Sequence, residues 1–224
     1  MTNIIFRDPA AARAGGYVLT ITGILVAIGL FFHPMPTGGF KEEPSILENT
    51  PWWGLIHWII AYGFVACVLG GLLVLIGGGV ASRHWTNSLF WGCLTVGMIY
   101  FTGVSMMNGW VMHALAPHEN EVPILYAAMN NMLIGFGWLG NPLFLIGGTG
   151  IAIIEVIKKD LGMKRWIAWF GAIVFILSWG RGIGSATGLY FLEPLIMANI
   201  PAFLWLSYYG WLLAKEAKAQ ETQA

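Results

Sequence analysis

Residues 53–80 read WGLIHWIIAYGFVACVLGGLLVLIGGGV and contain no Asp, Glu, Lys or Arg. A helix that crosses a bilayer needs about 20 mainly apolar residues in succession. The run is continuous, whereas a transmembrane strand would alternate apolar and polar residues. This stretch therefore predicts a membrane-spanning α-helix.

Five other apolar runs resemble residues 53–80. They cover residues 17–32, 89–116, 142–157, 166–183 and 189–213. Residues 122–139 are also apolar, and Gly140, Asn141 and Pro142 separate them from the run at 142–157. We expect this extra segment to be either a surface or re-entrant helix, or the first half of one kinked or broken helix. The second alternative is preferred because Gly-Asn-Pro interrupts the backbone ladder without ending the apolar pattern.

The sequence thus predicts an all-α integral membrane protein. Residues 1–224 should form a single polytopic domain, a six-transmembrane-helix bundle whose fourth segment is broken or preceded by a surface helix. Residues 215–224 should form a polar tail. No convincing internal repeat divides the chain into two halves.

Composition excludes several classes of protein. Hydrophobic residues make up 57% of the chain and charged residues 10%, whereas soluble domains carry about 25% charged residues. The net charge is zero, so the basic surface typical of nucleic-acid binding is not expected. Cys67 and Cys93 both fall within apolar runs, so neither a disulfide framework nor a CxxC redox motif is present. A soluble enzyme and a nucleic-acid partner are therefore excluded, and the lipid bilayer is the expected environment.

The distribution of Lys and Arg predicts the orientation. Only Lys41 and Arg181 would lie outside if the N-terminus were inside. The residues that would lie inside are Arg7, Arg13, Arg83, Lys158, Lys159, Lys164, Arg165, Lys215 and Lys218. The positive-inside rule then places both termini in the cytoplasm. We expect a bacterial inner membrane protein.

Three histidines are expected at a common depth near the outer, periplasmic face. His33 ends the first apolar run, while His57 and His113 each lie about one turn inside the second and third spans. Small residues, Gly54 and Gly109 among them, accompany His57 and His113. Polar side chains are costly inside a bilayer, so their occurrence at one level suggests a binding site.

Two kinds of cofactor site are compatible with this pattern. In the first, His57 and His113 are the axial ligands of haem b, and Arg181 lies near the propionates. In the second, His33, His57 and His113 bind a copper, iron or zinc ion and leave one coordination position open. Neither alternative rests on a tight motif, because HxxxH and HExxH are both absent.

Arg181 and Glu193 form another candidate pair near the outer face. They either form a structural ion pair between two helices, or Arg181 binds an anion while Glu193 carries protons. Asn108, Asn130 and Asn131 either bind a quinone carbonyl or satisfy backbone groups at the helix break.

Three functions follow as hypotheses, and no specific enzymatic reaction is predicted. The first is a membrane redox protein, or a redox-complex subunit, with the histidine site and a quinone as candidate partner. The second is a non-catalytic subunit of a larger membrane complex, in contact with partner subunits or with further copies of itself. The third is a transporter of a small solute or metal ion, although the inner half of the predicted bundle lacks charged residues that would line a path.

Overall fold

The structure is a computed structural model that describes residues 4–33 and 44–222, apart from the side chains at positions 44, 45, 181, 185, 186, 190 and 193. Within these residues the fold is helical and contains no strand. The first five α-helices are α1 Pro9–Phe31, α2 Pro44–Asn49, α3 Trp53–Gly77, α4 Trp85–Met106 and α5 His113–Leu115. The other four are α6 Pro123–Lys158, α7 Arg165–Leu177, α8 Gly180–Thr187 and α9 Asn199–Glu221. A π-helix, Met107–Met112, joins α4 to α5. Short 3-10 helices cover Gly79–Ser82, Ala116–His118 and Tyr190–Ala198.

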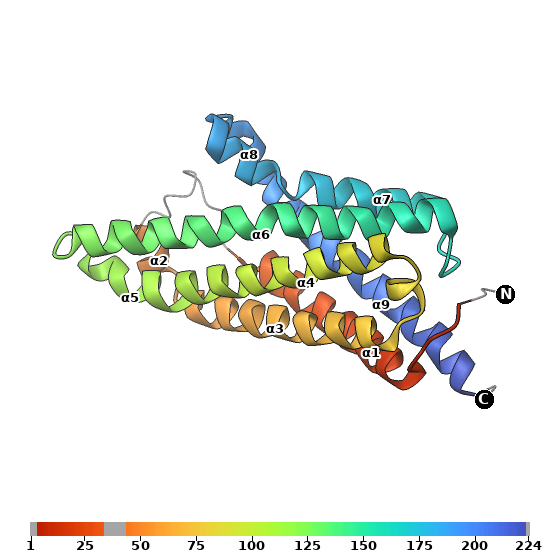
Figure 1. Cartoon of the computed structure of the whole chain (residues 1–224). Helices are drawn as coiled ribbons and strands as arrows, with labels where there is room; N and C mark the ends of the chain where they lie inside the picture. Colours follow the sequence, from red (N-terminus) through yellow and green to blue (C-terminus); the bar gives the residue numbers. More distant parts are fainter. Residues whose placement is uncertain (1–3, 34–43, 223–224) are drawn as a thin grey trace.

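Six helical stretches in the described chain are long and apolar enough to cross a membrane, as the sequence predicts. They begin at Pro9, Trp53, Trp85, Pro123, Arg165 and Pro194. They form a closed ring in which α1 packs beside α3, α3 beside α4, α4 beside α6, α6 beside α7, α7 beside α9, and α9 beside α1 (Figure 1). Each of these helices therefore has two neighbours and one side left for lipid.

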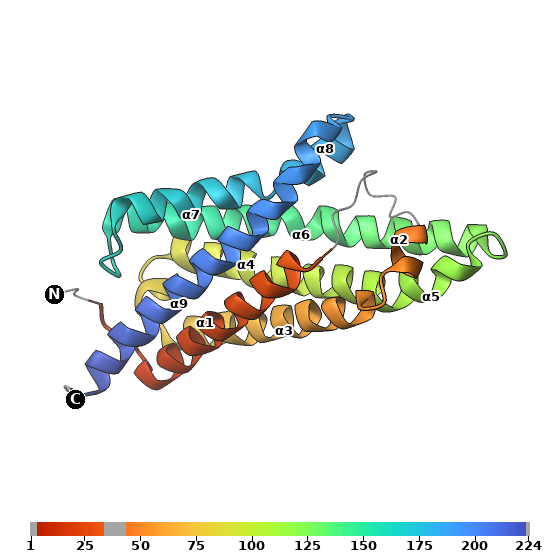
Figure 2. The ribbon, with the colours of Figure 1, turned by 180° about the vertical axis from the view of Figure 1, so that it is seen from behind.

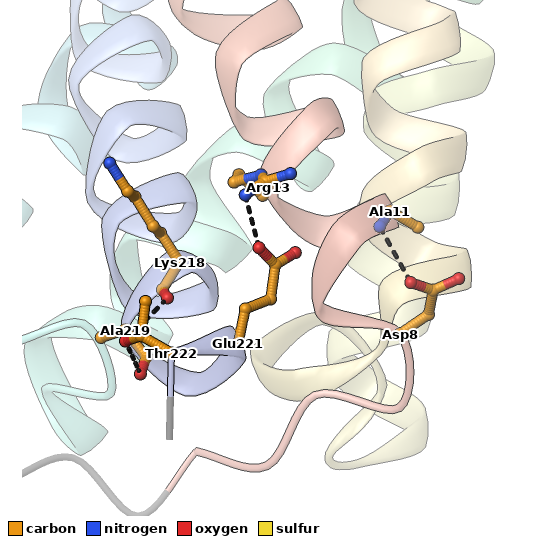
Figure 3. Close-up of polar contacts among 7 residues, drawn as sticks. All are labelled: Asp8, Ala11, Arg13, Lys218, Ala219, Glu221 and Thr222. Carbon is orange, nitrogen blue, oxygen red and sulfur yellow. Dashed lines mark hydrogen bonds and ion pairs between the residues drawn. The ribbon is translucent and has the colours of Figure 1, made fainter. Parts of the chain in front are cut away.

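Both described ends of the chain lie at the same end of the bundle (Figures 1 and 2). We call this the proximal end, and we call the opposite end, where α1 finishes at Phe31 and α3 begins at Trp53, the distal end. Asp8 caps α1 by accepting a hydrogen bond from the Ala11 amide at 3.0 Å (Figure 3). Arg13 forms an ion pair with Glu221 near the end of α9 (Figure 3). The proximal ends of the first and last helices are thus tied together.

Glycines let α1 and α9 approach until their backbones touch. A Cβ atom on Gly16 would lie 2.6 Å from the Gly210 carbonyl oxygen, and one on Gly210 would lie 2.7 Å from the Gly16 carbonyl oxygen. Small residues support helix association in membranes because close contact replaces the hydrophobic driving force. This reciprocal contact fixes the spacing between α1 and α9.

Phenylalanines from five helices meet at the centre of the ring. Phe144 lies at the middle of this cluster, with its ring centroid 5.3 Å from those of Phe101 and Phe203 and 5.0 Å from that of Phe175. Phe64 joins them from α3, 5.5 Å from Phe101 and 5.6 Å from Phe203. We call these five residues the phenylalanine cluster.

Replacing Phe144 with alanine is expected to destabilise the fold by about 3 kcal/mol. Loss of a buried Phe side chain costs about 3–5 kcal/mol in soluble proteins, and the lower end applies because association in lipid depends on packing more than on the hydrophobic effect. Unfolding of the purified protein in mild detergent measures this change. Phe170→Ala is the matched control, because Phe170 is 45% exposed on α7. Equal destabilisation by the two substitutions would contradict the central role of Phe144.

The segment at 122–139 and the predicted fourth span belong to one continuous helix, α6, with Pro142 inside it. The alternative in which residues 122–139 are the first half of one long helix is therefore confirmed, whereas a break or a separate surface helix is wrong. Pro142 has no amide hydrogen, but Asn141 Nδ2 donates to the Gly137 carbonyl oxygen at 2.8 Å, so a side chain supplies a donor in this turn. At about 1.5 Å per residue, α6 is about 54 Å long.

Two other predicted boundaries differ from the structure. Residues 215–221 continue α9 rather than forming a separate polar tail. The fifth span consists of α7 followed by α8, with an interruption at Ser178 and Trp179. Polar residues on the last turns of α9 continue the helix because Ala214 and Ala217 on the same turns remain buried against the bundle.

Candidate functional site

His33 and His57 come together at the distal end. His33 follows the last turn of α1, and His57 lies on the second turn of α3. Their Nε2 atoms are 3.2 Å apart, and their ring centroids are 4.9 Å apart. His57 is only 3% exposed. The structure therefore places two of the three predicted ligands in direct contact.

A backbone contact fixes the tautomer of neutral His57. Its Nδ1 lies 2.9 Å from the carbonyl oxygen of Trp53. A carbonyl can only accept, so Nδ1 must carry the hydrogen and Nε2 must carry the lone pair. A histidine that binds a metal commonly donates its other ring N–H to such an oxygen. His57 thus presents an unprotonated Nε2 towards His33.

Trp53 holds this arrangement in place. Its indole Nε1 donates to the Asn108 carbonyl oxygen at 3.1 Å, and its side chain is fully buried. The Trp53 ring lies 4.6 Å from the His57 ring and 5.0 Å from the His33 ring. Asn108 belongs to the π-helix, a type of turn that occurs frequently at functional sites.

Gly109 allows the π-helix to pass beside His57. A Cβ atom on Gly109 would lie 2.3 Å from the His57 Cβ atom, so no other residue fits without a shift. From the sequence, Gly109 is expected to be a small neighbour of His113. The structure shows instead that the missing side chain of Gly109 makes room for His57. This contact sets the distance between α3 and the helix that follows α4.

A cavity of about 150 Å³ adjoins the two histidines, between the distal end and the phenylalanine cluster. Its polar lining consists, besides His33 and His57, of Ser105, Asn108, Asn141, Ser178 and Asn199. Its apolar lining includes Ile60, Leu133 and Ile200 and three members of the phenylalanine cluster, Phe64, Phe101 and Phe203. Met197 adds a thioether. The cavity thus combines a polar part with a hydrocarbon part.

Two of the lining amides have unsatisfied oxygens. The Oδ1 atoms of Asn108 and Asn199 are buried and have no hydrogen-bond partner within the protein. Asn199 Nδ2 donates to the Ile196 carbonyl oxygen at 2.9 Å, which fixes the orientation of that amide. A buried acceptor without a donor costs free energy, so these two oxygens are suited to a bound group that carries an O–H or N–H.

The other predicted site residues have different positions. His113 begins α5, beyond the π-helix, and does not line the cavity. Among the side chains that the structure describes, which do not include that of Glu193, no three from His, Cys, Asp or Glu are arranged to hold a metal ion. The Nδ1 atom of His113 is buried without a hydrogen-bond partner in the structure. The axial pairing of His57 with His113 stays a prediction.

Arg181 and Glu193 are placed only by their backbones. Arg181 lies in α8, and Glu193 lies in the 3-10 helix Tyr190–Ala198. Their side chains are outside the part of the chain that the structure describes, so the predicted ion pair or anion clamp has no geometry to support it. Gly182 and Met197, close to them in sequence, do line the cavity.

Sequence reasoning missed several residues of the cavity. Met197, Asn141, Ser178 and Asn199 are not predicted as site residues, although each lies in or beside an apolar run. A polar amide within a predicted span is the available signal, because an unpaired amide is costly in lipid. Of the three candidate amides, Asn108 lines the cavity, whereas Asn130 and Asn131 do not.

No family model matches the chain, and neither a curated protein nor a solved structure is detectably similar to it.

Proposed function

We propose that this chain is an integral membrane redox protein, or a subunit of a membrane redox complex, with a copper ion bound between His33 and His57. The ion would alternate between Cu(I) and Cu(II) by exchanging one electron with a carrier in the membrane, for which a quinone is the expected class. The site would face the periplasm and both termini the cytoplasm of a bacterial inner membrane. The excess of Lys and Arg in the loops expected inside supports this orientation.

The observation that carries the proposal is the Nε2–Nε2 distance of 3.2 Å. Two imidazole nitrogens on one tetrahedral ion, each about 2.0 Å from the metal, lie about 3.3 Å apart. The hydrogen bond from His57 Nδ1 to the Trp53 carbonyl leaves Nε2 free to donate its lone pair to such an ion. The same distance fits a hydrogen bond between the rings, so metal content is the measurement that separates the two interpretations.

The neighbouring donors favour copper over the harder metals. The described lining of the cavity includes amides, hydroxyls and the Met197 thioether but no carboxylate. Imidazole and thioether ligands select copper, especially Cu(I), whereas magnesium and calcium prefer carboxylate oxygens. Met197, an amide oxygen or water would complete the coordination.

The size of the cavity favours an ion over a haem. A cavity of about 150 Å³ holds a molecule the size of benzene, and haem is a macrocycle of four pyrrole rings. The haem alternative, with His57 and His113 as axial ligands, therefore has less support than a mononuclear metal.

Transport has less support than a fixed site. The phenylalanine cluster lies beneath the cavity, and its central member Phe144 is 1% exposed. A hydrophilic solute would have to pass this packed layer of aromatic rings, for which the described residues provide no polar route. A role as a partner subunit is compatible with the proposed copper site.

Metal analysis of the wild-type protein tests the proposal. Protein purified in mild detergent without chelators, or reconstituted with Cu(I), should contain about one copper ion per chain. Oxidation should produce a Cu(II) electron paramagnetic resonance signal that disappears on reduction. A protein that remains free of stoichiometric copper after reconstitution would refute the copper site, and a Soret band that shifts on reduction would favour the haem alternative instead.

A further inference from the structure

The cavity beside the two histidines is larger than a metal ion needs. Its volume of about 150 Å³ equals that of an engineered apolar cavity that binds benzene. Only part of this space adjoins the nitrogen atoms of His33 and His57, because the cavity also reaches Phe64, Phe101 and Phe203. The space next to the phenylalanine rings is therefore available to another occupant.

Water alone is a poor occupant of a cavity with this lining. A buried water needs two to four polar partners, and most of the lining residues are apolar, Phe64, Phe101 and Phe203 among them. The lining also includes Asn108 and Asn199, whose amide oxygens are unsatisfied. A molecule with an apolar body and one hydrogen-bond donor would suit both parts of the lining at once.

The charge of the lining restricts the occupant further. Among the lining side chains that the structure describes, none is Asp, Glu, Lys or Arg. An ion placed beside the phenylalanine cluster would lose its hydration without gaining a counter-charge, which is strongly unfavourable. The occupant should therefore be neutral.

We propose that this cavity binds a small uncharged molecule, no larger than a substituted benzene, that has an apolar body and a single O–H or N–H donor. The suggestion that the bound molecule is the redox substrate rests on the proposed function, because the molecule would lie beside the copper ion. Binding of the molecule in the cavity does not itself require the metal.

Gly137 provides a variant that fills the cavity without touching a histidine. Gly137 is buried and lines the cavity, and a Cβ atom there would meet only Asn141 Nδ2, at 3.8 Å. Gly137→Leu should therefore place its side chain into the empty space. Gly135→Leu is the matched control, since Gly135 lies on the same helix, is exposed, and would have nothing within 4 Å of an added Cβ atom.

Phenol is the probe, measured as saturable binding above the background of empty detergent micelles. Wild type and Gly135→Leu should bind phenol at about one site per chain, and Gly137→Leu should bind at least about tenfold more weakly. Benzene, which lacks the donor, and benzoate, which carries a charge, should both bind more weakly than phenol. Val104→Phe fills the same cavity from α4 and serves if Gly137→Leu does not fold.

The outcomes separate this inference from the copper proposal. Equal phenol binding by wild type and both filled-cavity variants, or no saturable binding by wild type, would overturn the inference. Binding of benzoate as tight as that of phenol would overturn the requirement for a neutral molecule, and equal binding of benzene would overturn the role of the donor. Copper content is measured on the same samples: phenol binding without copper leaves the cavity inference intact and refutes only the proposed function.

Discussion

Replacing His57 with alanine is expected to lower copper affinity by more than about 100-fold. Changes in residues that only orient metal ligands typically cost about 10–100-fold, and removal of one of the two imidazole ligands should cost more. The loss follows from the geometry, because His57 Nε2 is the nitrogen that faces His33 at 3.2 Å. Metal analysis after equilibration with buffered Cu(I) gives the affinity.

His84→Ala is the control for this prediction. His84 is exposed at the proximal end, immediately before α4, and its side chain does not cap that helix. The His84→Ala substitution should leave copper binding unchanged, whereas His33→Ala should reproduce the loss expected for His57→Ala. If His57→Ala still binds stoichiometric copper with wild-type affinity, the assignment of His57 as a ligand is wrong. A purely structural histidine pair would show lower thermal stability in both variants and no copper in the wild type.

Gly16→Val is expected to be strongly damaging to the fold. A Cβ atom at this position would lie 2.6 Å from the Gly210 carbonyl oxygen and 2.8 Å from the Ala214 amide nitrogen. These atoms belong to the backbone of α9, so they cannot move aside without separating the two helices. We expect a cost at or above the upper end of the roughly 1–3 kcal/mol that overpacking causes, seen as a lower unfolding midpoint or as loss of folded protein from the membrane.

Gly92→Val distinguishes this contact from a general effect of valine in a helix. A Cβ atom on Gly92, in α4, would have nothing within 4 Å. This variant should change stability by no more than about 0.5–1 kcal/mol, the scale of intrinsic helix propensities and ordinary surface substitutions. Equal loss of folded protein in both variants would show that the α1–α9 contact is not limiting.

The sequence allowed prediction of the number and type of the long helices, because length and continuous apolarity decide whether a segment can span lipid. It left open whether residues 122–139 and 142–157 form one kinked helix or are separated by a break. The pattern Gly140-Asn141-Pro142 is typical of a break, and only the three-dimensional structure shows Asn141 donating to the Gly137 carbonyl within an unbroken helix. Local propensity was overridden by the packing of α6 against α4 and α7.

The sequence predicted only part of the candidate site, because it indicates depth along a helix but not rotation about the helix axis. Depth along a helix can be counted from the sequence, so the approach of His33 to His57 followed from their positions near the ends of two adjacent spans. Rotation about the helix axis cannot be counted in the same way, since one residue turns a helix by about 100°. The structure places Gly109 beside His57, and His113, four residues further along, does not line the cavity. Asn199 and Met197 reach the cavity through the last helical stretch, and no spacing motif links them to the histidines.

The π-helix Met107–Met112 has a consequence for how this chain can vary in length. A π-turn contains about one residue more than an α-turn, so the segment is equivalent to a one-residue insertion absorbed inside a helix. A homologue lacking one residue here would have an ordinary α-helix instead of a gap. Its residues beyond this point would still present the same face towards the bundle, because the π-helix absorbs the extra residue locally. Such a deletion would therefore alter mainly the bulge itself, where the Asn108 carbonyl accepts from Trp53, while the helix on either side kept its orientation.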